Sequence, residues 1–130
     1  MKKFLKWSGI VLIMLIAIMM IYSIIGKDEV LDLRIKAVDL APIPDGTYVG
    51  SYDNYRWTNK VEVSVSEHKI TGIKPLKIQQ GRDGLVKELI LKILDRQSPD
   101  VDAITGATAS SNGFLKAVET ALESASKRSP

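Results

Sequence analysis

The chain has 130 residues, contains no cysteine and carries a net charge of +3 at pH 7. The lack of cysteine excludes disulfides, thiolate metal sites and a lipid-modified cysteine anchor. Lys2, Lys3 and Lys6 supply three of the 18 basic residues, so from Lys27 onward 15 basic residues face 15 acidic ones. A neutral domain without a basic stripe argues against nucleic-acid binding.

Residues 7–26 form an uncharged run, rich in Ile, Leu and Met, between Lys6 and Lys27. A helix of this length is about 30 Å long, which matches the hydrocarbon core of a bilayer. A buried core helix would keep a polar face. The run is also long for a secretory signal and lacks an A-x-A-like cleavage site, so we expect an uncleaved single-pass anchor. The lysines before it predict a cytoplasmic N-terminus and an extracytoplasmic C-terminal domain at the cell membrane.

Four segments are expected along the chain. They are an anchor with a short cytoplasmic flank at 1–27, a connector at 28–44, a folded domain at 45–126 and a frayed tail at 127–130. In the connector, Pro42 and Pro44 block a helix, and a short amphipathic turn is expected around Leu31–Val38.

The domain opens with a predicted antiparallel meander of three strands. Residues 46–53 place Tyr48 and Val49 on opposite faces. Residues 59–67 alternate valines with polar residues, which is the pattern of a half-buried strand. A turn that contains His68 then leads to a third strand with Ile70 and Ile73. His68 is the only histidine, and we expect it to be a solvated turn residue rather than a metal ligand.

Two helices are predicted after the meander. Residues 81–97 carry Asp83 as the expected N-cap and end before Pro99. Residues 112–127 form the second helix, with Ser110 or Ser111 as its cap. The expected apolar faces comprise Leu85, Leu89, Ile93 and Leu94 in the first helix and Phe114, Val118, Ala121, Leu122 and Ala125 in the second. The expected fold is α+β: one transmembrane helix, then a small antiparallel sheet packed with two helices on one face.

The loop VDAITGATASSNGF, residues 101–114, is the stretch that most suggests a site. It ends where a helix should begin, and free N–H groups and the helix dipole favour an anion there. Gly106 accepts a positive φ, Ala107 leaves the approach open, and Thr108 offers a hydroxyl. A phosphate, bound or esterified, fits this place. Local chemistry alone fits an ordinary serine-capped loop better.

No self-contained catalytic set accompanies this loop. The sequence has neither a phosphate-binding glycine loop with its lysine nor a G-x-S-x-G nucleophile elbow. The carboxylates are scattered over positions expected to be exposed. We therefore expect no catalytic residue and no metal site, and whether the chain acts as an enzyme stays open.

The segment Asp102-Ala103-Ile104-Thr105-Gly106-Ala107-Thr108 resembles the flavinylation motif of the FMN-binding domain family. That motif is Asp, two variable positions, Ser or Thr, Gly, Ala, Thr, and its second position is often glycine where this chain has alanine. The meander and the stretch FLKAVETAL are similar to the family's opening strands and closing helix. The resemblance therefore covers residues 45–125. The family includes the flavin-carrying peripheral subunits of the sodium-pumping quinone reductase and the Rnf complex.

The resemblance implies that a flavin transferase, which brings its own magnesium, takes FAD and esterifies the FMN half to Thr108. It also implies that the residues around Thr108 shape the cofactor site or are read by the transferase; these are Asp102, Thr105, Gly106, Ala107 and Ser110. The expected function is an electron carrier that exchanges electrons with a membrane redox partner, such as a quinone reductase-type complex. Two alternatives stay open: a non-catalytic peripheral subunit of a larger membrane oxidoreductase complex, and a flavin-free anchored binding module.

An isoalloxazine ring needs a flat apolar or aromatic surface. The domain offers five aromatic side chains: Tyr48, Tyr52, Tyr55, Trp57 and Phe114. We expect Trp57 as the stacking partner among them, although core or surface packing is the simpler expectation for each.

Overall fold

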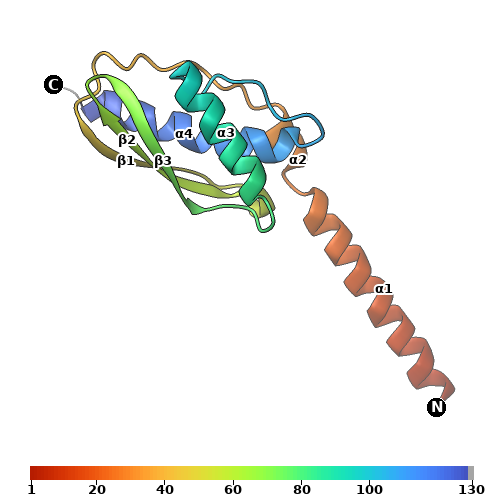
Figure 1. Cartoon of the computed structure of the whole chain (residues 1–130). Coiled ribbons are helices and arrows are strands. Elements are labelled where there is room, and N and C mark those ends of the chain that lie inside the picture. Colours follow the sequence, from red (N-terminus) through yellow and green to blue (C-terminus); the bar gives the residue numbers. More distant parts are fainter. Residues whose placement is uncertain (129–130) are drawn as a thin grey trace.

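The computed structural model describes residues 1–128 and places a long helix ahead of a small α+β domain (Figure 1). The helix, α1 (Lys2–Ile24), buries none of its residues and stands out from the domain. It is long and apolar enough to cross a membrane. It ends at Ile24, and Gly26, with a φ of +79°, turns the chain into the short helix α2 (Lys27–Leu31).

Three strands form one antiparallel sheet in the order β1 (Gly46–Tyr52), β2 (Asn59–Ser66) and β3 (Lys69–Lys77). Alternating valines make β2 the central strand, because its valine side chains all point into the core and are buried. Tyr48 is buried and Val49 is exposed, as predicted. Glu67 and His68 form the tight turn between β2 and β3, both with positive φ, and His68 is exposed.

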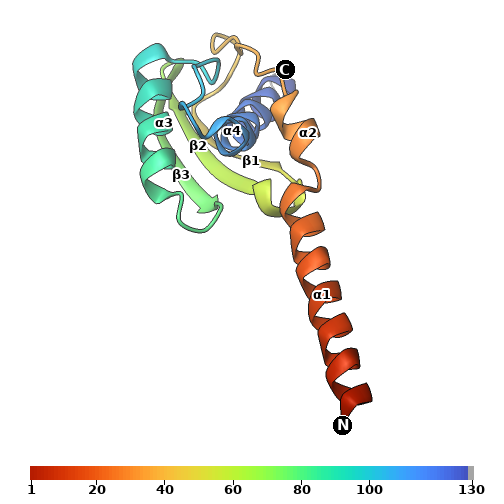
Figure 2. The same ribbon diagram turned by 90° about the vertical axis from the view of Figure 1, so that its right-hand side faces the viewer.

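Two long helices, α3 (Asp83–Arg96) and α4 (Thr108–Arg128), complete the domain. The sheet curves around α4, and α3 lies beside β3 on the same side (Figure 2). The expected α+β class with an antiparallel sheet and two packed helices is confirmed. Gly50 allows β1 to lie directly on α4, since a Cβ there would stand 2.3 Å from the Ala117 carbonyl oxygen.

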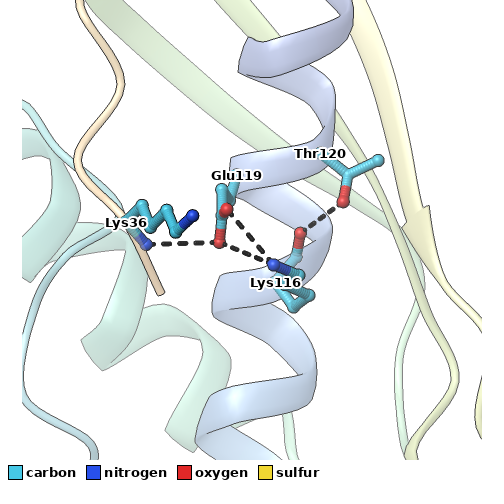
Figure 3. Close-up of polar contacts among 4 residues, drawn as sticks. All are labelled: Lys36, Lys116, Glu119 and Thr120. Atoms are coloured by element: carbon cyan, nitrogen blue, oxygen red, sulfur yellow. Dashed lines mark hydrogen bonds and ion pairs between the residues drawn. The ribbon is translucent and has the colours of Figure 1, made fainter. Parts of the chain in front are cut away.

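The connector is part of the domain core. Val30 and Ile43 are fully buried, and polar side chains of α4 hold the connector backbone at Val30 and Lys36. Asn112 donates from Nδ2 to the Val30 carbonyl oxygen at 3.0 Å. The buried carboxylate of Glu119 accepts from the Lys36 backbone N–H at 3.3 Å and pairs with Lys116 Nζ at 3.2 Å (Figure 3).

Several predicted boundaries and caps were wrong. The connector is helical at 27–31 and has no regular secondary structure over 33–40, so no amphipathic turn covers Leu31–Val38. Asp83 is the first residue of α3 rather than its cap, and Arg82 occupies the cap position. The other end of α3 agrees with the prediction of a helix that ends at residue 97, before Pro99: the last helical residue is Arg96, and Gln97 is the left-handed C-cap with φ of 59°.

The core-facing side of α3 is also turned slightly from the expected one. Val86 is buried with Leu89 and Ile93, while Leu85 and Leu94 are half-buried at its margins. The expected face of α4 is fully buried. The frayed tail predicted at 127–130 overlaps the end of α4, which includes 127 and 128; residues 129 and 130 lie outside the described part of the chain.

Candidate functional site

The loop before α4 closes in a tight turn over residues 104–107. The Ala107 N–H donates to the Ile104 carbonyl oxygen at 2.9 Å, and Gly106 sits in the turn with φ of +81°. A turn with a positive φ at its third position favours glycine there, which explains Gly106. The turn delivers the chain directly into α4, with Thr108 as its first residue.

Helix α4 begins earlier than the serine caps predicted. Its first helical hydrogen bond joins the Ser111 N–H to the Ala107 carbonyl oxygen at 2.9 Å, so Ala107 holds the cap position. Ser111 is fully buried and its Oγ accepts from the Ile104 N–H at 3.1 Å, which fixes the loop from inside the helix. Ser110 is buried and donates to Gln79 Oε1 at 2.7 Å.

The start of α4 forms one wall of a cleft of about 480 Å³. Gly106, Ala107, Thr108, Ala109 and Ser110 line it in sequence. Thr108 is exposed, so its hydroxyl is accessible from the cleft. The free N–H groups of a helix start and the helix dipole make this wall suited to an anion.

Three cationic side chains line the same cleft: Lys27, Arg56 and Arg82. Each comes from a different element, namely the first residue of α2, the short 3-10 helix η1 (Tyr55–Trp57) and the cap position of α3. No acidic side chain is among the lining residues of this cleft. The charge of the cleft is therefore positive, which favours a phosphate group.

Arg56 and Trp57 are positioned by the structure of η1. Thr58 Oγ1 accepts from the Asn54 N–H at 3.0 Å and donates to the Tyr55 carbonyl oxygen at 2.8 Å, which holds Tyr55 at a φ of 47°. Gly113 lets α4 lie close to the backbone of η1, since a Cβ at Gly113 would lie 2.8 Å from the Trp57 carbonyl oxygen. The Arg56 guanidinium lies over the Trp57 ring, 5.2 Å from its centroid.

The aromatic side chains differ in their relation to the cleft. Trp57 lines it but is 96% shielded from solvent by its surroundings, Arg56 included. Tyr48 and Phe114 belong to the core, Tyr52 is half-buried beside Asn54, and Tyr55 is exposed next to Tyr22 of α1. The structure therefore brings only Trp57 of the five aromatic side chains to the cleft.

The expected site residues fall into two groups. Gly106, Ala107, Thr108 and Ser110 line the cleft together. The other two are exposed and do not line it: Thr105 lies in the turn, and Asp102 borders a separate hollow of about 190 Å³ near the end of α3. Within residues 1–128 no three His, Asp or Glu side chains are grouped so as to hold a metal ion.

Sequence reasoning missed Lys27, Arg56 and Arg82. Lys27 was taken only as the end of the apolar run, and the two arginines carry no local motif. Lys27 and Arg56 are 29 residues apart along the chain, and Arg56 and Arg82 are 26 apart, so only the fold brings the three cations to one cleft. The only features of the local sequence that set the two arginines apart are the glycines beside Arg82 and the tryptophan beside Arg56.

The comparison with known proteins agrees with this geometry. No curated protein matches the chain. The family model of the FMN-binding domain matches residues 55–123, which run from η1 through the cleft-lining loop and most of α4. With more than half of the sequence matched, the chain belongs to the FMN-binding domain family, and FMN is its cofactor.

Proposed function

We propose that the chain is a membrane-anchored electron carrier whose FMN is attached through its phosphate to Thr108. The observation that carries the proposal is the place of Thr108: exposed, first in α4, and in a cleft lined by three cations and no carboxylate.

The residues of the cleft fit FMN. Its volume of about 480 Å³ lies in the usual range of small-molecule sites. The start of α4, together with Arg56 and Arg82, would hold the phosphate. Trp57 and Leu31 offer apolar surface in the same cleft to a flat ring. When bound, FMN supplies reversible electron transfer, and the protein binds and orients it.

Attachment is a phosphoryl transfer at Thr108 Oγ1. The oxygen bonds to the phosphorus of the FMN half of FAD, the bond from that phosphorus to AMP breaks, and the hydroxyl proton leaves to a base of the transferase. Gly106 and Ala107 carry no bulky side chain beside Thr108, which leaves it open to such an enzyme. The expected roles of Asp102 and Thr105 fit recognition by the transferase, because both are exposed outside the cleft.

Topology supports the carrier role. With α1 in a membrane and Lys2, Lys3 and Lys6 on its cytoplasmic side, the domain lies outside the cytoplasm. A cofactor lost there is hard to recover, so a covalent tether is an advantage. The electron partner of such a carrier is a redox protein or complex of the same membrane.

The test is flavin fluorescence of the denatured chain in a gel after co-expression with a flavin transferase. Wild type and Thr108→Ser should fluoresce, and Thr108→Ala should not, because only the first two offer a hydroxyl. Thr71→Ala, which removes an exposed hydroxyl of β3, is the matched control and should keep the flavin. A fluorescent Thr108→Ala chain would refute the attachment site, and a dark wild type would refute covalent attachment.

A further inference from the structure

One wall of the cleft lies outside the part of the chain that the family model matches. Ser23, Lys27 and Leu31 line it, and Ser23 lies in the last turn of α1. The matched family domain begins only at residue 55, so this wall comes entirely from the N-terminal segment.

Polar contacts hold this wall in place. Arg56 Nη1 donates to the Ser23 carbonyl oxygen at 3.3 Å, so a cleft residue is itself tied to α1. Asn54 Nδ2 donates to the Gly26 carbonyl oxygen at 2.9 Å and to the Tyr52 hydroxyl at 2.9 Å. Gly26 is required at the joint between α1 and the rest of the chain, because a Cβ there would stand 1.9 Å from Asn54 Oδ1.

Aromatic side chains meet at the same joint. Tyr22 of α1 and Tyr55 of η1 pack edge to face with ring centroids 6.5 Å apart, and both remain more than half exposed. Exposed tyrosines beside the end of an apolar helix are typical of the membrane–water interface. Lys27, just beyond the apolar run, suits the same level, where a lysine can keep its charge among the headgroups.

We infer that the anchor forms part of the FMN site, and that the cleft is thereby fixed in the lipid headgroup layer. The cleft is lined by a residue of the last turn of the membrane helix, so it lies within about one turn, or about 5 Å along the axis, of the end of the apolar run. Thr108 then faces the membrane surface rather than the bulk solvent. The inference rests on the proposed membrane crossing and deepens the proposed function, since it places the cofactor where membrane-borne partners meet it.

The test uses the natural lack of cysteine, so that it does not depend on flavin attachment. Full-length Thr108→Cys carries a small thiol-reactive fluorophore and is reconstituted in lipid vesicles. Lys69→Cys is the matched control: Lys69 is exposed at the start of β3, and the turn between β2 and β3 lies at the end of the sheet away from α1 in Figure 1. Lipids with a nitroxide on the headgroup should quench the label at 108 several-fold more than the label at 69. Nitroxides deep in the acyl chains should quench both weakly.

A second variant tests the joint itself. A glycine–serine insert of about 20 residues between Ile24 and Ile25 leaves the fold of the domain intact but frees it from the membrane by roughly 25 Å. It should lower the quenching at 108 to the level of the Lys69→Cys control. Equal quenching at 108 and 69 without the insert, or chains that do not float with the vesicles, would overturn the inference. Loss of flavin attachment alone refutes the proposed function and leaves this measurement unchanged.

Discussion

The proposed role of Thr108 depends on side chains that the fold brings to it rather than on its neighbours in the sequence. Thr108 is exposed at the start of α4, and the groups that can attract a phosphate come from residues far away in the sequence. Arg82 is the clearest of these, because it stands at the cap position of α3 and lines the cleft.

Arg82→Ala should weaken the reversible binding of FMN to the unmodified chain by about tenfold, since a charge-assisted hydrogen bond to a phosphate contributes about 1.5–3 kcal/mol. Titration followed by flavin fluorescence measures the change. Arg96→Ala is the matched control at the other end of α3, where Arg96 forms an exposed ion pair with Asp100 at 3.9 Å. Equal weakening by both changes would show a non-specific charge effect and contradict the role of Arg82.

Tyr52 predicts a pH dependence of stability. Burial raises the pKa of its hydroxyl above the usual value of 10.0, with Glu29 acting in the same direction and the hydrogen bond from Asn54 against it. Because the folded-state pKa is the higher one, the contribution of Tyr52 is intact below about pH 10 and is lost as the pH rises through the folded-state pKa.

Tyr52→Phe should therefore reduce the fall in the free energy of unfolding between pH 9 and pH 11, measured by chemical denaturation of the full chain in detergent. Other tyrosines and lysines titrate in both proteins, so the difference between the two curves isolates Tyr52. Parallel curves would contradict this assignment.

At the scale of elements, the packing of β1 on α4 depends on the absence of a side chain at Gly50. Gly50→Ala should lower the free energy of unfolding by about 1–3 kcal/mol or more, because its Cβ would meet the backbone of Ala117 and Ala121 at 2.3 Å. Gly84→Ala is the control: Gly84 lies in α3 with nothing within 4 Å, and alanine there should stabilise by about 0.5–1 kcal/mol. Thermal denaturation of both variants checks the opposite signs, and a stable Gly50→Ala chain would contradict the close approach.

The connector is held by α4 through Glu119. Glu119→Ala should lower the free energy of unfolding by about 2 kcal/mol, because the buried carboxylate is lost and the Lys36 N–H loses its acceptor in a partly buried hydrogen bond. Lys116 also loses its ion-pair partner, but it is half-buried and can reach water, which offsets part of the loss in stability. Glu123→Ala, an exposed position on the same helix, should change little. Proteolysis in the connector, followed by mass spectrometry, should increase only for Glu119→Ala; equal susceptibility would count against the clamp.

The elements themselves were largely predictable, because their signals are local. The alternating valines of β2 and the helical spacing of Leu89 and Ile93 each fix a buried face within a few residues. The start of α4 was placed too late because serines are good caps, whereas the turn at Gly106 already leads into the helix and Ser111 is buried within it. Tertiary packing overrode the local preference.

At the scale of the whole molecule, the sequence carried no sign of the long-range contacts. Asn112 and Glu119 reach back 82 and 83 residues to the connector, whose isolated apolar residues show no periodicity. The cations of the cleft are equally dispersed along the chain. The loop of the site could therefore be found from the sequence, but neither its electrostatic surroundings nor the wall formed by the anchor could be.

The whole molecule combines a long apolar helix, a connector clamped to α4 and an α+β domain (Figure 2). Residues from the last turn of α1 and from the start of α4 line one cleft. In the proposed function, this arrangement would give FMN a fixed place relative to the membrane, with Thr108 as the point of attachment.

The most direct test of that attachment is tandem mass spectrometry of the tryptic peptide 97–116, from protein co-expressed with a flavin transferase. This peptide contains every hydroxyl of the loop: Ser98, Thr105, Thr108, Ser110 and Ser111. The account predicts one FMN, less one water, on Thr108 alone. A flavin on any other residue of this peptide, or an unmodified peptide from a folded chain and an active transferase, would contradict it.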